Sequence, residues 1–303
     1  MSVPYSYQFM NLYNSAVNPS TVHCKNTALV NYYTRYLLQK VMSVYDFTGL
    51  PEEWAENYFK YCLFAFGYLA VFDTERYGVI CQECTLSDTY TIFRQPKIAI
   101  VTNPLFKKSL ELVIGEDCEV IKLQPDYGNV MDIVGTYADL MGLCLETAGT
   151  NLLNSKMSYV FFSDNKTAAE SFKKMYDKLA SGEPMAVIDK NLMNDDGTKS
   201  WDFFMQNVGQ NFIVDKVMDT LKNLEDQFNT RVGIPNANTQ KRERLITDEV
   251  KANDVDTKSL VSLWLDTMRK DINKVNKMFN LNIAVSYRYE QTYEPEVTTN
   301  EQR

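Results

Sequence analysis

Residues that bind metals or perform redox and acid–base chemistry are sparse in this sequence. Cys81 and Cys84 form a lone Cys-x-x-Cys pair, and His23 is the one histidine among 303 residues. A structural zinc site needs four ligands. A redox pair is expected at a helix N-terminus, whereas the sequence on both sides of Cys81 and Cys84 is typical of strands. We therefore expect no metal site, no catalytic role for His23, and free core thiols in a reducing cytosol.

A second candidate for chemistry is Gly197-Thr-Lys-Ser200, which resembles the end of a phosphate-binding loop. It lacks the preceding glycine spacing and the Gly-Lys pair, and no apolar strand leads into it. The carboxylates between Asp248 and Asp256 lie in a polar segment, where a solvated loop explains them as well as a metal site would. We expect no cofactor and no enzymatic activity.

The basic cluster Lys241, Arg242 and Arg244 is the strongest candidate for binding. It lies in the polar segment Arg231–Asp256, and loops this long are uncommon in compact domains unless they have a function. The whole chain is acidic, with a net charge of −8 and a pI of about 4.9. Because affinity for phosphates comes from Lys and Arg, this balance does not favour a protein that grips DNA, but it is compatible with DNA that slides.

The first 128 residues are predicted to form a compact α+β domain. Residues 26–47 have helical periodicity, and a second helix begins at Pro51, with Trp54, Tyr58, Tyr61 and Cys62 facing inward. Four short β-rich runs follow, separated by turn residues. They are Tyr68–Phe72, Tyr77–Cys81, Lys97–Val101 and Glu119–Leu123.

A long helix is predicted over Asn129–Leu153, about 37 Å in length. Gly135, Gly142 and Gly149 recur in it every seven residues and therefore lie on nearly one stripe. Each glycine costs about 1 kcal/mol of helix propensity relative to alanine. The alternative is chance placement, but we expect these three glycines to mark subunit packing, where another backbone comes close.

The remaining sequence predicts a small insert followed by two more helices. The insert, Ser155–Gly209, contains a strand (Tyr159–Phe162), a helix (Thr167–Leu179) and another strand (Met185–Ile188). A second long helix spans Gln210–Thr230 and carries Lys216 and Lys222, and a third spans Ser259–Phe279. The strand Asn282–Tyr289 follows, and the chain after Glu290 is polar. No apolar stretch is long enough to cross a membrane, so no membrane partner is expected.

The polar segment contains four distinctive motifs: Gly233-Ile-Pro-Asn-Ala-Asn238, Lys241-Arg-Glu-Arg244, Thr247-Asp-Glu-Val250 and Asn253-Asp254. In these motifs the chain resembles the portal, or upper-collar connector, of small short-tailed bacteriophages of the phi-29 type. Further matches are Val214-Asp-Lys216, Leu281-Asn282, Val285, Arg288-Tyr289, Leu50-Pro51 and Phe66-Gly-Tyr68. The resemblance is densest over residues 212–290 and weaker over residues 73–130 and the insert.

The resemblance implies a portal fold with separate parts and a ring of about twelve subunits. The implied parts are a wing (1–128 and 257–290), stem helices (129–153 and 210–231), a clip (154–209), a tunnel loop (232–256) and a flexible tail (291–303). Lys241, Arg242 and Arg244 are then expected to contact DNA in the channel, with Lys216 and Lys222 as weaker candidates. A solvated helix face is the alternative for these last two.

The implied location is the head–tail vertex of the virion, after assembly in the host cytoplasm. The implied partners are further copies of the chain, double-stranded DNA read without sequence specificity, the major capsid protein, the scaffold, a packaging ATPase (with or without a packaging RNA) and the lower collar or tail. Two alternatives remain: a lower-collar or tail-tube ring protein, and a DNA-processing enzyme such as a nuclease that uses the loop carboxylates.

Overall fold

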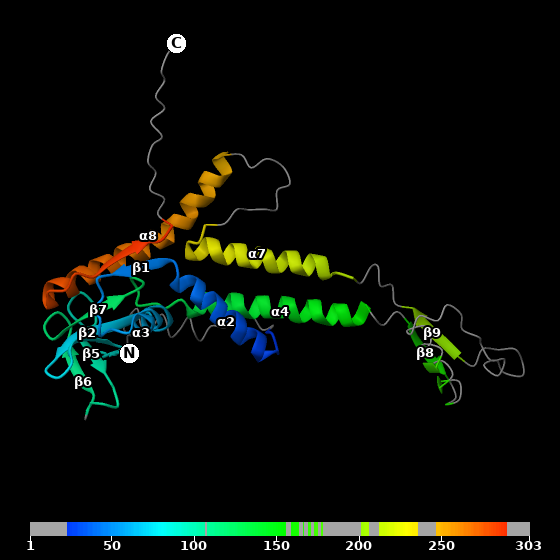
Figure 1. Cartoon of the computed structure of the whole chain (residues 1–303), viewed down its shortest axis with the longest axis horizontal. Coiled ribbons are helices and arrows are strands. Elements are labelled where there is room, and N and C mark those ends of the chain that lie inside the picture. The colour runs from blue at the N-terminus through cyan, green and yellow to red at the C-terminus, as the bar shows by residue number, and fades with distance from the viewer. Residues whose placement is uncertain are drawn as a thin grey trace, which may run out of the picture. The chain divides into compact units, whose positions relative to one another are not determined.

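The computed structural model describes residues 23–289, apart from 107, 156–158, 164–165, 167–168, 171–172, 175–176, 178–200, 206–211 and 236–246 (Figure 1). The chain divides into two compact units. One comprises Met1–Leu143 with Lys222–Arg303, and the other Cys144–Leu221. Helices and antiparallel sheets both contribute, so the predicted α+β class is confirmed. Within the described residues, no helix combines the length and apolar content that a membrane crossing requires.

The first unit begins with helix α2, Thr27–Met42. The side chain of Asn26 caps it by accepting hydrogen bonds from the backbone N–H groups of Ala28 and Leu29. The prediction that this helix continues to residue 47 is wrong, because strand β1, Tyr45–Thr48, follows at once. Tyr45 and Phe47 are buried while their neighbours are less so, which is the alternation of a strand.

The helix predicted from Pro51 is shorter and turned differently than expected. It consists of α3, Glu56–Tyr61, and a π-helical turn η1, Cys62–Phe66. Trp54 and Cys62 are buried as predicted, but Tyr58 and Tyr61 are exposed. The buried positions are instead Phe59 and the start of η1, so the apolar face is displaced by about one residue from the predicted one.

Two three-stranded antiparallel sheets form the centre of the first unit. One has the order β3-β2-β7 and the other β4-β5-β6. Their strands are β2 (Tyr68–Thr74), β3 (Gly78–Gln82), β4 (Thr85–Leu86), β5 (Ile98–Val101), β6 (Leu110–Val113) and β7 (Cys118–Lys122). The four predicted runs are confirmed to within two residues. Strands β4 and β6 were not predicted, and β4 has only two residues.

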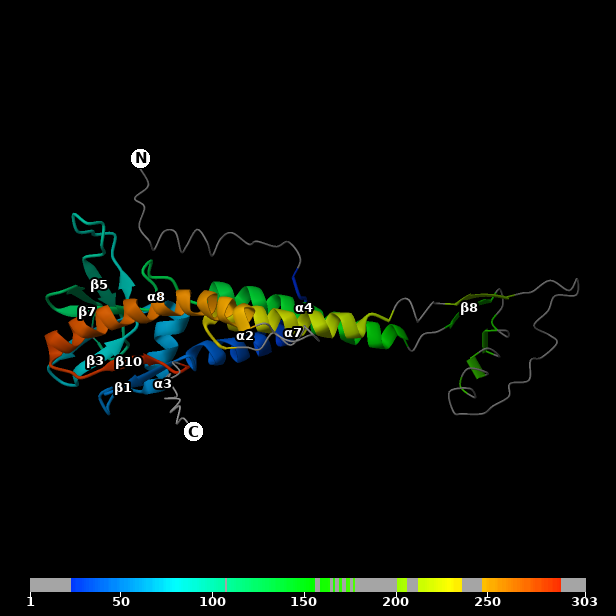
Figure 2. The ribbon, with the colours of Figure 1, turned by 90° about the horizontal axis from the view of Figure 1, so that it is seen from above.

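The sheet β3-β2-β7 is covered on both faces, as Figure 2 also shows. On one face of this sheet, side chains that include Phe72 and Val120 pack with Ala99 and Val101 of β5. Side chains on the other face of the sheet lie toward the helices, since α8 and η1 both contact this sheet. Because both faces are buried, β2 is apolar at successive positions from Leu69 to Phe72 instead of alternating.

The last helix of the first unit, α8, spans Thr247–Phe279 and leads into strand β10, Ala284–Tyr287. The expectation of a structureless loop up to Asp256 is therefore wrong at its C-terminal end, since the helix begins twelve residues before Ser259. Thr247-Asp-Glu places acidic residues in the first turn, where the helix dipole favours them. The polar composition that suggested a loop therefore belongs to the start of a helix.

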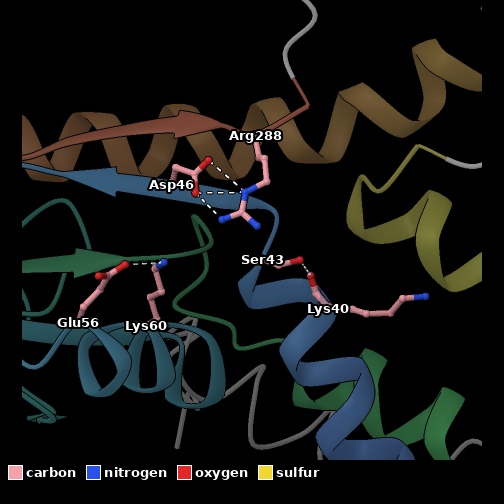
Figure 3. Close-up of polar contacts among 6 residues, drawn as sticks. All are labelled: Lys40, Ser43, Asp46, Glu56, Lys60 and Arg288. Carbon is pink, nitrogen blue, oxygen red and sulfur yellow. Dashed lines mark hydrogen bonds and ion pairs between the residues drawn. The ribbon is translucent and has the colours of Figure 1, made fainter.

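Strand β10 pairs with β1, which joins the two ends of the described chain. Arg288, just after β10, binds the carboxylate of Asp46 on β1 through Nε and Nη2, the shorter contact being 2.5 Å (Figure 3). A second ion pair in the same view links Lys60 to Glu56 at 2.7 Å within α3. The last strand therefore closes the fold as predicted, on a partner strand that had been read as helix.

Two long helices connect the units. Helix α4 spans Met131–Ser155 and α7 spans Val214–Val232, so both long-helix predictions are confirmed with shifts of two to four residues. The second unit contains a strand pair, β8 (Tyr159–Ser163) with β9 (Trp201–Met205), of which β9 was not predicted. The described residues of the predicted helix Thr167–Leu179 are helical, whereas the predicted strand Met185–Ile188 lies outside the described residues.

Candidate functional site

The glycine stripe of α4 has two kinds of surroundings. A Cβ added to Gly142 would lie 3.3 Å from Sγ of Cys24 and 3.6 Å from Val30. Around Gly135 and Gly149, by contrast, no described residue lies within 4 Å of such an atom. At Gly142 the close neighbour is therefore the beginning of the same chain. At Gly135 and Gly149 the helix surface is open, and subunit packing there stays a proposal.

Asp139 lies one helical turn before Gly142 and holds the segment that covers it. Its carboxylate binds Nδ1 of His23 at 2.7 Å and accepts a hydrogen bond of 2.9 Å from the backbone N–H of Cys24. His23 thus has a polar partner that the sequence did not reveal, and its role is to attach residues 23 and 24 to α4. No local sequence pattern indicates this contact, because 116 residues separate His23 from Asp139.

The two predicted lysines of α7, Lys216 and Lys222, are both exposed. They are six residues apart, so they point about 120° away from each other around the helix. The helix as a whole carries four acidic and three basic residues, and α4 carries three acidic residues and no basic one. The long helices are therefore acidic surfaces on which each of these lysines is a local positive charge.

Lys40 of α2 and Glu225 of α7 form a partly buried ion pair that sequence reasoning missed. Nζ of Lys40 lies 2.5 Å from Oε1 of Glu225 and donates a 3.0 Å hydrogen bond to Oδ1 of Asn229, while the hydroxyl of Tyr36 donates to Glu225 at 2.6 Å. Burial disfavours both charges, but the mutual attraction outweighs it. The net pKa of Lys40 is raised and that of Glu225 is lowered.

Contacts between α4 and α7 occur in each unit. In the first unit the rings of Tyr137 and Phe228 meet edge to face, with centroids 5.5 Å apart. In the second unit the side chain of Asn151 accepts a 3.0 Å hydrogen bond from the backbone N–H of Ile213. Each contact pairs an early part of one helix with a late part of the other, as in antiparallel neighbours. The predicted pair of helices is thus held by an aromatic contact and a helix-end hydrogen bond.

Gly233, where the polar segment begins after α7 and here called its root, is fixed in the core of the first unit. Gly233, directly after α7, has a φ of +85°, and a Cβ there would stand 1.8 Å from Cγ2 of Val261 in α8. Its carbonyl oxygen accepts a 2.5 Å hydrogen bond from the hydroxyl of Tyr287 in β10. Only glycine fits this backbone and this space. The predicted DNA-contacting residues Lys241, Arg242 and Arg244 lie outside the described residues, a few positions after this root.

The candidate redox and metal residues are core groups. Cys81 and Cys84 are three residues apart along an extended segment, so their side chains point to opposite sides, and Cys84 packs with the cluster around Phe72. Burial raises the pKa of Cys81 to about 12. All six cysteines are free thiols, four of them buried, as predicted. In the described part of the chain no three His, Cys, Asp or Glu side chains gather as metal ligands, and Gly197–Ser200 lies outside that part.

Comparison with known proteins identifies the family. The sequence matches the family described as Phage Connector (GP10) over residues 13–292. Among solved structures, one described as the portal and tail of native bacteriophage P68 is similar, at 15% sequence identity and a TM-score of 0.44, with 88% of this chain and 89% of that chain covered. The family match spans both compact units and most of the chain, which confirms the resemblance drawn from the motifs. The chain belongs to the phage connector family, that is, to the head–tail connector or portal proteins of bacteriophages.

Proposed function

We propose that this chain is one subunit of a closed ring of about twelve copies at the head–tail vertex of a virion, and that the ring forms the channel through which the genome is packaged, retained and ejected. The observation that carries the proposal is membership of the connector family over residues 13–292. Two long helices, α4 and α7, that lead into and out of a small separate unit are consistent with this role.

The parts of the subunit follow from this arrangement. Residues 1–128 and 257–290 form the wing, 129–153 and 210–231 the stem, 154–209 the clip, 232–256 the tunnel loop and 291–303 a flexible tail. The second compact unit, Cys144–Leu221, supports a separate clip, and the helical start of α8 makes the second half of the tunnel segment a helix. Gly135 and Gly149, which are open in the single chain, are the proposed packing points between neighbouring subunits.

Charge suits a channel in which DNA slides. Helix α4 contributes −3 and α7 contributes −1 per chain, and twelve chains of −8 carry −96 in total. Such a field repels a duplex more than it holds it. Lys241, Arg242 and Arg244 then supply a local ring of positive charge against the phosphates, with Lys216 and Lys222 as weaker contributors. These contacts position the backbone of the DNA and read no bases.

The same ring would attach the other components of the particle. The proposed partners are the major capsid protein and scaffold on the head side, and the packaging ATPase, with or without a packaging RNA, followed by the lower collar or tail. The chain itself would catalyse nothing, in keeping with its connector family and its buried, high-pKa thiols. Hydrolysis of ATP would belong to the motor partner.

Negative-stain images and native mass spectrometry of the purified protein test this proposal. The expected result is a closed ring with a central hole, formed without nucleotide or metal. A stable monomer of 35.0 kDa at every concentration would overturn it. A second readout is phosphate release from ATP by the pure protein, which should stay at background. Activity that disappears in Lys199→Ala would show that Gly197–Ser200 binds nucleotide after all.

A further inference from the structure

Among the described residues, the large apolar side chains with the highest exposed fractions lie at the tip of one hairpin. Between β4 and β5 the chain makes a projecting turn, residues Thr89–Lys97, here called the knob. Ile92 and Phe93 at its tip are 91% and 80% exposed. A phenylalanine in water loses the stabilisation that burial would give it, and such residues mark contact sites when they are held in place.

The knob is ordered by its own hydrogen bonds. The backbone N–H of Thr91 donates to the carbonyl of Gln95 at 2.8 Å, and that of Lys97 donates to the carbonyl of Thr89 at 2.9 Å. Arg94 has a φ of 59°, and its backbone N–H closes the turn by donating to the carbonyl of Thr91 at 3.0 Å. The tip is therefore a preformed apolar projection, whose docking orders few new groups and costs little conformational entropy.

The knob is also basic. It carries Arg94 and Lys97, both exposed, and no acidic residue, on a chain whose net charge is −8. A surface complementary to the knob would therefore be apolar at its centre, with acidic residues around it. Arginine and large apolar side chains are the groups that anchor protein interfaces, so this composition favours a protein partner.

A surface with the complementary composition lies on α3 and η1. Tyr58, Tyr61 and Phe66, here called the aromatic patch, are all exposed. The rings of Tyr61 and Phe66 touch edge to face at 5.7 Å, and Tyr58 is one helical turn from Tyr61. Exposed acidic residues accompany the patch: Glu52, Glu53 and Glu56 in the same segment, and Glu83, whose backbone hydrogen-bonds the hydroxyl of Tyr58. The one lysine of the segment, Lys60, is already paired with Glu56.

The knob and the aromatic patch do not cover each other within one chain. The knob extends from the sheet β4-β5-β6, which packs on the Phe72 face of β2, and its tip residues are almost fully exposed. Tyr58, Tyr61 and Phe66 are likewise exposed, so both surfaces are available to another molecule. They can join identical chains head to tail, which is the kind of contact that closes into a ring.

We infer that the knob of one subunit docks on the aromatic patch of the neighbouring subunit in the ring, with Arg94 and Lys97 against the glutamates around that patch. The inference rests on the proposed ring. A second copy is the occupant that the charges favour, and in a ring every copy meets the same neighbour, so all knobs are buried alike. A partner of a different symmetry would offer each knob a different surface.

A photo-crosslinking amino acid at position 93 tests the contact directly. Phe93 is 80% exposed, so its replacement should leave the fold intact. In purified rings, irradiation should produce dimers whose crosslink maps to residues 51–66 of the second chain. A crosslink to any other segment, or none in intact rings, would overturn the inference while leaving the ring proposal standing. Failure to form rings with the unsubstituted protein would overturn both.

Substitutions test the energetic role. Ile92→Ser with Phe93→Ser should reduce the fraction of chains in rings at least tenfold, with an unchanged unfolding midpoint of the subunit. Leu105→Ser is the matched control, because Leu105 is 76% exposed in the loop that follows β5 and should leave rings unaffected. Equal ring yields from the two variants would contradict a role for the knob.

Mixing separates this head-to-tail contact from any other interface. The knob variant retains an intact patch, and Tyr61→Ser with Phe66→Ser retains an intact knob. Mixed together, they can form one good interface per pair, so the expected product is a heterodimer of twice 35.0 kDa. If the mixture shows no dimer beyond what each variant forms alone, the two surfaces are not partners. Circular dichroism of each variant before mixing verifies that both are folded.

Discussion

Tyr287 and Gly233 are joined by a 2.5 Å hydrogen bond although 54 residues separate them in the sequence. The hydroxyl of Tyr287, on the last strand, donates to the carbonyl of Gly233, where α7 ends. Gly233 also packs against Val261 in the middle of α8. The segment that carries Lys241, Arg242 and Arg244 therefore leaves the core from a fixed point.

Replacing Gly233 by alanine is expected to destabilise the protein by about 3 kcal/mol, because the added methyl group meets Val261 and the backbone is left-handed. Gly115→Ala is the matched control. Its φ of +88° is nearly the same, but no described residue lies within 4 Å of the new Cβ, so backbone strain alone should cost about 1 kcal/mol. Urea unfolding of both variants measures the difference. Equal losses would mean that the contact with Val261 contributes nothing.

The Lys40–Glu225 pair predicts a pH dependence at the acid side. The folded pKa of Glu225 is below its ordinary 4.5, so its ionised form stabilises the fold above that pH, and the contribution is lost as the pH falls through the folded pKa. The folded pKa of Lys40 is above 10.5, so its contribution is present up to that pH and is lost only above it.

Glu225→Gln should therefore cost about 1 kcal/mol at pH 7, a value kept small by partial solvent exposure, and the cost should shrink toward zero below pH 4.5. Unfolding midpoints of both proteins, measured from about pH 3.5 to about pH 8, give the pH dependence of this cost. Glu111→Gln, which removes an exposed carboxylate on β6, is the control. A cost that is independent of pH would mean that the charge of Glu225 does not contribute.

Substitutions at Gly135 and Gly149 test subunit packing more directly than a substitution at Gly142. A Cβ atom at Gly149 or Gly135 would have no described residue of the same chain within 4 Å, so leucine there should leave the isolated subunit folded, with a gain of about 1 kcal/mol from helix propensity, while ring closure fails. Leucine at Gly142 should instead destabilise the subunit by about 1–3 kcal/mol, because it displaces Cys24. Native mass spectrometry and thermal unfolding separate the two effects. Normal rings from Gly149→Leu and Gly135→Leu would rule out subunit packing there.

Removing the basic cluster should affect DNA retention and leave assembly intact. Changing Lys241, Arg242 and Arg244 together to alanine is expected to give normal rings and proheads, because solvent-facing charges contribute little to folding. Filled heads should then lose their genome. The measurement is the fraction of DNA-full capsids relative to ring yield in the same preparation. The charge-conserving set Lys241→Arg, Arg242→Lys and Arg244→Lys should behave like the natural protein, and loss of the rings themselves would show that the loop is structural.

The sequence by itself determined the features that repeat over short distances. The 3.6-residue periodicity of α4, α7 and most of α8 can be seen within the sequence of each helix alone, because a helix buries residues three or four positions apart. The family, too, was readable from the motifs between Gly233 and Asp254. The start of α8 at Thr247 was missed, since a polar helix start and a polar loop have the same composition.

Only the tertiary structure decided which distant residues meet. The alternating segment Tyr45–Thr48 is too short for its pattern alone to identify a strand, and its partner, β10, lies at the other end of the described chain. Likewise, the sequence could not distinguish the three α4 glycines, whereas the fold places Cys24 on Gly142 and leaves Gly135 and Gly149 open. Local patterns record the face that each element buries. The identity of the surface that covers it depends on contacts between elements far apart in the chain, and no local pattern encodes these.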